Sequence, residues 1–349
     1  MDANDENADF PIPLWSMLQF ELGTLDHDAE MVAVCNGRRV VIRLLPNNFT
    51  TPSIKEKYLF FIKAADNFED DTVEDFYDWI AKPLLPFFEQ LNQLDAVPST
   101  LEAFLFPDTH FYSLRSEGDA VVAVPDPNGK LEGPLYGAKL PESHTASWPS
   151  FKPSEIHILE EEHCVGPPSP KPSRVQMSNG QVAFLKLLWP SEKRSFMGEL
   201  DTYKQIRDAN LPENLQISRL HGIVRDDDGI LYGLLLTYID SARMTLSCAA
   251  SGPDIDAQLL QKWSEEIDDI AGQLHKAGIA WGDAKSDNIL MDRVTNSVWL
   301  IDFGGSYTEG WVPRELAGTV EGDLVGIGKI KEFLRGELTL DSLSAQNEV

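Results

Sequence analysis

Two short segments in the last quarter of the chain constrain the fold more than any other feature. The first, 282–290, reads Gly-Asp-Ala-Lys-Ser-Asp-Asn-Ile-Leu, and the second, 300–305, reads Leu-Ile-Asp-Phe-Gly-Gly. Nineteen positions separate Asp283 from Asp302, which leaves room for a loop, two short strands and their turn. Either segment alone is also explained as an ordinary turn or strand end, but the two together, in this order, favour a shared site.

These residue types are the ones that transfer of a phosphoryl group from ATP requires. Such a transfer needs metal ions bridging the phosphates, positive charge near the moving group and an acceptor held in line. Asp283 is expected at the acceptor hydroxyl, and Asn288, five positions later, offers an amide oxygen to a metal. Asp302 follows an apolar strand and is the expected main metal ligand.

The segments upstream of this pair alternate between strand and helix patterns. Two Asn-Gly pairs, at 36–37 and 179–180, lie between apolar runs and predict β-hairpins, because these residues tolerate positive φ. A third pair of apolar runs surrounds Asp-Asp-Asp-Gly at 226–229, which we interpret as a turn rather than a cation site. Helical spacing is found at 55–64, 73–88, 194–206 and 256–276.

The motifs and their order resemble the protein-kinase superfamily. Segment 281–288, Trp-Gly-Asp-Ala-Lys-Ser-Asp-Asn, is similar to the family's His-Arg-Asp-x-Lys-x-x-Asn catalytic loop, and 302–304 is similar to its Asp-Phe-Gly motif. Leu-His-Lys-Ala-Gly-Ile at 274–279 adds to the signature. The resemblance covers roughly residues 155–335 and looks closest to the divergent protein-kinase-domain proteins of fungi.

This resemblance implies a role for each motif residue. Asp283 would be the catalytic base that accepts the proton of the acceptor hydroxyl, and Asn288 and Asp302 would bind Mg²⁺. Lys285 would offset charge at the γ-phosphate of ATP, and a lysine at this place is typical of kinases that act on Ser or Thr.

Further cofactor-binding residues follow upstream. Lys186 ends an apolar strand and must be paired, since an isolated buried ammonium is costly, although a lysine that extends to solvent remains the alternative. Its expected partner is Glu199 on the following helix; Glu192 and Asp201 are competitors. By the resemblance, backbone groups near Thr237 and Ile239 would bind the adenine edge.

Asp323 resembles the aspartate that opens the family's central helix in the C-terminal lobe. There it would brace the catalytic loop through backbone hydrogen bonds. An ordinary helix N-cap explains an aspartate at this place equally well, so both interpretations stay open.

Several features depart from the family pattern. Gly166 stands alone before the proline-rich stretch 167–172, so no glycine-rich phosphate loop is recognisable. Gly282 replaces the arginine of the catalytic loop, so an activation-loop phosphate would lack its usual partner. No Ala-Pro-Glu motif follows Asp302, and the sequence after Asp323 is short.

The predicted fold class is α+β, with a two-lobed protein-kinase-like fold that has a shortened C-terminal lobe. A separate α+β domain of unknown role is expected at 1–150. The kinase-like domain would span 151–340, with an N-lobe of about 155–236 and a C-lobe of about 240–340, and 341–349 would be a polar tail.

Charge and cysteine content limit the partners and the compartment. The formal net charge of -27 disfavours nucleic acid and anionic lipid. Three dispersed cysteines suggest no disulfide framework, the N-terminus lacks a signal pattern, and no apolar run is long enough for a membrane span. We therefore expect an intracellular, cytoplasmic protein without nucleic-acid or membrane partners.

Three functions are consistent with these patterns. The first is an ATP- and Mg²⁺-dependent phosphotransferase acting on a hydroxyl, with a protein Ser or Thr as the expected acceptor. The second is a pseudokinase or nucleotide-binding scaffold, suggested by the missing phosphate loop. The third is a small-molecule phosphotransferase, whose relatives share a Gly-Asp loop and often lack Ala-Pro-Glu.

Overall fold

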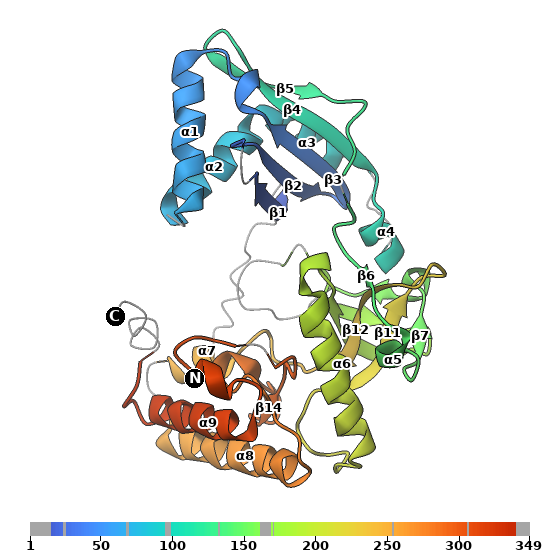
Figure 1. Cartoon of the computed structure of the whole chain (residues 1–349), viewed down its shortest axis with the longest axis vertical. Coiled ribbons are helices and arrows are strands. Elements are labelled where there is room, and N and C mark those ends of the chain that lie inside the picture. Colours follow the sequence, from blue (N-terminus) through green and yellow to red (C-terminus); the bar gives the residue numbers. More distant parts are fainter. Residues whose placement is uncertain are drawn as a thin grey trace, which may run out of the picture. The chain divides into compact units, whose positions relative to one another are not determined.

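The chain forms two compact units, each described here by itself (Figure 1). The computed structural model describes residues 15–23, 26–67, 70–94, 99–131, 133–160, 169, 171–252, 255–305 and 307–339. The first unit ends at Gly133 and the second begins at Pro134, with 166–172 assigned to the first. The predicted polar tail at 341–349, Gly166 and most of the proline-rich stretch lie outside the described residues.

The boundary between the units lies earlier in the chain than the predicted position at residue 150. Strands β6 (Ala138–Lys139) and β7 (Ser150–Phe151) pair with β12 (Ile230–Thr237) and β11 (Leu220–Arg225) of the second unit. Because their backbone hydrogen bonds go to that sheet, residues 134–151 belong to it.

The first unit is a five-stranded sheet packed against helices. Its described elements are β1 (Ser16–Leu22), β2 (Ala29–Cys35), β3 (Arg38–Leu44), α1 (Pro52–Asp66), α2 (Asp70–Ala81), α3 (Leu85–Asn92), α4 (Leu101–Leu105), β4 (Thr109–Glu117) and β5 (Ala120–Pro125). The strand order is β1-β2-β3-β4-β5, and all neighbours are antiparallel except β3 and β4. A parallel pair needs a crossover, which the helices between β3 and β4 supply.

The predicted hairpin of this unit is confirmed. Strands β2 and β3 pair from Ala29↔Leu44 to Cys35↔Arg38, and Asn36 and Gly37 form the turn with φ of 46° and 70°. Positive φ at both turn positions is the conformation that matches the twist of the strands. The predicted helical stretch 73–88 is divided at Lys82–Leu84 by a 3-10 turn, where Pro83 interrupts the helix.

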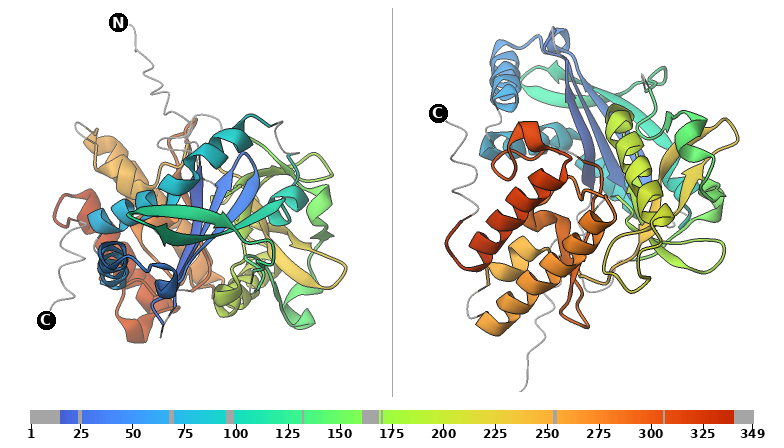
Figure 2. Two further views of the ribbon diagram at one scale, coloured as in Figure 1. Left: turned by 90° about the horizontal axis from the view of Figure 1, so that it is seen from above. Right: turned by 60° about the horizontal axis from the view of Figure 1, so that its bottom comes forward.

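The second unit has a sheet in its N-terminal part and mainly helices in its C-terminal part (Figure 2). Its remaining described elements are α5 (Glu142–Thr145), β8 (His157–Ile158), β9 (Arg174–Gln176), β10 (Val182–Leu187), α6 (Lys193–Asp208), α7 (Leu246–Ala250), α8 (Ala257–Lys276), β13 (Ile289–Met291), β14 (Val298–Leu300) and α9 (Val320–Leu334). The strand order of the main sheet is β7-β11-β12-β10-β9-β8, with β6 beside β12, and β13 and β14 form a separate pair.

One hydrophobic core runs through the second unit. The buried face of α6 packs with β11 and β12, and the same cluster continues to α8, α9 and the β13–β14 pair. The apolar stripe of α8 that the sequence predicted, which includes Trp263, Ile267 and Leu274, faces this core. Loops between these elements are therefore held on a packed scaffold.

The mixed α+β class is confirmed by these elements. Both predicted turns of the second unit are present: Gly180 and Gly229 have φ of 85° and 79° between paired strands. Among the described residues, no helix is both long enough and apolar enough to cross a membrane.

Candidate active site

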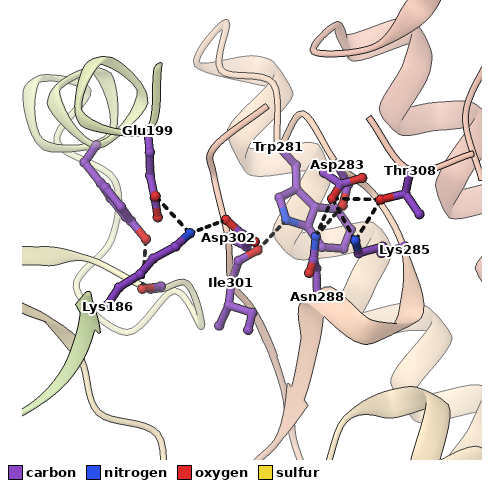
Figure 3. Close-up of polar contacts among 11 residues, drawn as sticks. Lys186, Glu199, Trp281, Asp283, Lys285, Asn288, Ile301, Asp302 and Thr308 are labelled. Atoms are coloured by element: carbon purple, nitrogen blue, oxygen red, sulfur yellow. Dashed lines mark hydrogen bonds and ion pairs between the residues drawn. The ribbon is translucent and has the colours of Figure 1, made fainter. Parts of the chain in front are cut away.

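Lys186 forms two ion pairs that join the sheet, α6 and the segment after β14 (Figure 3). Its Nζ lies 2.9 Å from Glu199 Oε2 and 2.7 Å from Asp302 Oδ1. The competing acids have other positions: Glu192 is the N-cap residue of α6, and Asp201 contacts His144 at 2.7 Å. The side chains that sequence reasoning placed together therefore lie within contact distance.

The charges in this cluster depend on one another. Glu199 is fully buried, and burial raises the pKa of its carboxyl, against the opposing effect of Lys186. Burial alone would lower the pKa of Lys186, but Glu199 and Asp302 outweigh it and raise the pKa. Lys186 is thus held in its charged form by two carboxylates.

Asp302 has an unusual backbone conformation. Its φ is 58°, in the left-handed region that residues other than glycine rarely occupy. Two bonds hold the preceding residue: Ile301 N–H donates to Asn288 O at 3.0 Å, and Trp281 Nε1 donates to Ile301 O at 2.8 Å. Such a conformation persists only where several surrounding contacts stabilise it, and it occurs more often at functional sites than elsewhere.

The loop after α8 places a second cluster around Asp283, which is 2% exposed. Asn288 Nδ2 donates to the Asp283 carbonyl at 2.9 Å and to its Oδ2 at 3.0 Å. Lys285 Nζ lies 3.0 Å from the same Oδ2. In Figure 3, Asp302 lies between this cluster and the pair of Lys186 and Glu199.

Thr308 belongs to this cluster and was not identified from the sequence. Its hydroxyl donates to Asp283 Oδ2 at 3.2 Å and accepts from Lys285 Nζ at 2.7 Å. No local pattern distinguishes Thr308 from other threonines, because its neighbours are set by the path of the chain after Asp302.

Asp323 holds the loop at 281–282 in place through hydrogen bonds to its backbone. Its carboxylate accepts the backbone N–H of Trp281 at 2.7 Å and of Gly282 at 2.8 Å, and contacts His275 Nε2 at 2.9 Å. The N-cap of α9 is Thr319, so the structure favours the bracing role over the capping role. Burial raises the pKa of Asp323, and these three partners oppose the shift.

Gly282 lies where a side chain would be strained. Its φ is 96°, and a Cβ atom there would lie 2.9 Å from Gly305 Cα. Its carbonyl accepts from Gly318 N at 3.2 Å, so the start and the end of the segment after Asp302 both reach this residue. Backbone of the segment after Asp302 therefore lies against Gly282 and leaves no room for a side chain there.

A cavity of about 340 Å³ opens beside the first cluster. Lys186, Glu199 and Asp302 line it, together with Thr237, Ile239 and apolar groups such as Leu236. The Thr237 N–H is bonded to Arg219 O at 2.9 Å. Within the described residues the Ile239 N–H has no acceptor.

The polar groups fit Mg²⁺ and ATP. Among the described residues no three His, Cys, Asp or Glu side chains gather to hold a metal by themselves. Mg²⁺ bound with nucleotide needs only one or two protein ligands, because phosphates and waters supply the rest. Both bonds of Asn288 use Nδ2, so its Oδ1 and the second oxygen of Asp302 are suited to this role.

Comparisons with known proteins place these features in context. No protein-family model matches the chain. Myotonin-protein kinase of Mus musculus is 30% identical over 128 residues, which is 36% of this chain and 19% of that protein, and the Homo sapiens protein gives the same values. Part of this chain is distantly similar to a protein kinase. The match spans about a fifth of the length of those relatives.

Proposed function

We propose that the second unit is a two-lobed, protein-kinase-like phosphotransferase that moves the γ-phosphoryl group of ATP to a Ser or Thr hydroxyl. The observation that carries the proposal is the position of Asp302, which pairs with Lys186 and lies between two clusters of polar side chains (Figure 3). One holds Lys186 and Glu199 at a cavity of nucleotide size, and the other holds Asp283 and Lys285. The similarity to myotonin-protein kinase adds support.

Each side chain of the two clusters has a proposed role that agrees with its contacts. Asn288 and Asp302 would hold Mg²⁺ with ATP, which when bound would supply the phosphoryl group and offset its charge. Lys186, fixed by Glu199, presents positive charge toward the nucleotide cavity. Because the ion pair fixes the orientation of the lysine side chain, that side chain needs little reorganisation when the reaction occurs.

The acceptor side rests on Asp283. Its carboxylate receives the proton of the acceptor hydroxyl as the oxygen attacks, and ADP leaves with the bridging oxygen. Asn288, Lys285 and Thr308 contact this carboxylate and orient it. Because Lys285 lies beside it, positive charge is available where the transferred group passes.

The test is transfer from γ-labelled ATP by the full chain, with Mg²⁺ and Ser/Thr peptide pools as acceptors. Asp283→Asn and Asp302→Asn should each reduce transfer at least about a hundredfold. Asp227→Asn, an exposed residue at a hairpin turn, is the matched control and should leave transfer unchanged. Equal transfer by wild type and Asp283→Asn would remove Asp283 from this role.

A small-molecule phosphotransferase is the second candidate. The path from Asp302 to Asp323 is short, and its end is held at Gly282 by Gly318. Little chain therefore remains there to present a peptide. Transfer to small alcohols and not to peptides would favour this candidate, and stabilisation by Mg²⁺–ATP without transfer to either would favour a nucleotide-binding scaffold.

A further inference from the structure

A second cavity of the second unit, of about 400 Å³, lies where α6 ends and β11 begins. It shares no lining residue with the first cavity. None of the residues assigned above to Mg²⁺, ATP or the acceptor lies in its wall, and two of its lining residues, Arg219 and His221, bond Thr237 of the first cavity.

Two arginines supply the positive charge of this cavity. Arg207, Arg219, His221 and Glu213 line it, and Arg207 Nε also lies 3.1 Å from Asp208 Oδ1. Burial lowers the pKa of His221, so the positive charge rests on the arginines. Arginine is the side chain best suited to bind phosphate through paired N–H donors.

The two arginines are held in place by neighbouring groups. Arg207 stacks on the Trp148 ring, 4.4 Å from its centroid, and donates from Nη1 to Ser147 O at 3.1 Å. Arg219 donates from Nη2 to Pro212 O at 2.6 Å. Each guanidinium has five N–H donors, so these bonds orient it without using them all. Such preorganisation lowers the entropy lost on binding.

The remaining wall is apolar and partly aromatic. Trp148, Tyr203, Ile206 and Leu220 are buried and line the same cavity. An apolar wall beside fixed cationic groups suits a ligand that has a flat apolar part and an anionic end. The volume is that of a small-molecule site.

We propose that this cavity is a binding site for a small aryl phosphate, with the phosphate between Arg207 and Arg219 and the ring against Trp148 and Ile206. Its phosphate accepts from the guanidinium groups, and Glu213 at the rim opposes its charge. The site shares no lining residue with the cavity assigned to ATP.

The test uses phenyl phosphate as probe and isothermal titration calorimetry of the full chain at constant ionic strength. Wild type should bind one equivalent, and Arg219→Gln should weaken binding about tenfold, since it removes a charge-assisted bond. Glu213→Gln should strengthen binding about twofold, because it removes a like charge from an exposed position. Arg335→Gln, which removes an exposed arginine paired with Glu337, is the matched control and should change nothing.

Several results would overturn the proposal. Absence of saturable binding to wild type would do so, as would equal weakening by Arg219→Gln and Arg335→Gln. If inorganic phosphate binds as tightly as phenyl phosphate, the aromatic ring contributes nothing to the affinity, and the proposal is wrong. Glu213→Gln that weakens binding would contradict the assigned direction of its charge.

A measurement on wild type guards against variants that fail to fold. Burial, and then the charge of Arg219, lower the pKa of His221, and the other ionisable side chains lining the cavity are Tyr203, Arg207 and Glu213. A bound phosphate places negative charge nearby, so the NMR titration of the His221 ring should move to higher pH. An unchanged titration at saturating phenyl phosphate would place the ligand elsewhere and refute the proposal.

Discussion

Removal of the Lys186 charge gives a sharp test of the buried cluster. Lys186→Met keeps much of the side-chain length but leaves the Glu199 carboxylate without its cation. Glu199 is fully buried, and Asp302, also paired with Lys186, adds a second negative charge nearby. We expect a large loss of stability, whatever the protein catalyses.

The magnitude follows from the geometry. At 2.9 Å the Lys186–Glu199 attraction is roughly 6 kcal/mol with an effective dielectric constant of about 20. Part of this is offset by the cost of burying both charges, and measured losses on breaking buried pairs are about 3–5 kcal/mol. Lys186 and Asp302 are partly exposed, so we take about 3 kcal/mol as the expected loss at neutral pH.

The assay is urea denaturation followed by tryptophan fluorescence. Six of the eight tryptophans lie in the second unit, so the signal reports mainly on it. The loss should shrink as pH falls, because Glu199 already has a raised pKa and takes up a proton more readily without Lys186. The double variant Lys186→Met/Glu199→Gln should recover most of the loss.

Lys152 supplies the matched control. It pairs with Asp227 at 2.8 Å, but both side chains are exposed, so Lys152→Met should leave the denaturation midpoint unchanged. If Lys186→Met costs no more than Lys152→Met, or if the double variant is less stable than Lys186→Met, the buried-pair reasoning is wrong.

Two further predictions concern the loop and the second cavity. Gly282→Ala should lower the free energy of unfolding by about 2 kcal/mol, because its φ is 96° and the new Cβ would contact the Gly305 backbone. Gly328→Ala is the control, since no atom lies within 4 Å of a Cβ at that position. Equal effects of the two substitutions in urea denaturation would contradict the prediction. The pKa of His221 is lowered in the folded protein, so the unfolded chain takes up this proton first and stability should fall as pH drops through about 6.5 toward the folded pKa. His221→Gln should flatten this part of the urea-denaturation pH profile, and a profile identical to wild type would show that His221 does not cause it.

Much of the fold could be predicted because its signals are local. Asn36-Gly37 and Asn179-Gly180 allow positive φ wherever they occur, and the strands on either side follow from short apolar runs. The long helix α8 was predicted from its apolar stripe. Strands β6 and β7 were missed because two-residue strands have no period to detect.

The candidate site residues also divide into those that the sequence indicated and those that only the structure shows. Spacing indicated Asp283, Asn288 and Asp302, because a loop and two short strands restrict where these side chains lie. Thr308 and the cavity beside Arg219 have no such spacing. Their neighbours come from chain segments that meet only after the core has packed.

By itself the sequence determined the local conformations and the identity of the acidic, amide and basic groups. Only the tertiary structure decided which of them meet: that Lys186 has two carboxylate partners, that Asp323 braces the loop instead of capping a helix, and that Gly305 excludes a side chain at Gly282. The physical reason is the sequence separation over which each interaction acts. Turns and periodicity depend on a few neighbouring residues, whereas these ion pairs, hydrogen bonds and steric contacts involve residues far apart in the chain.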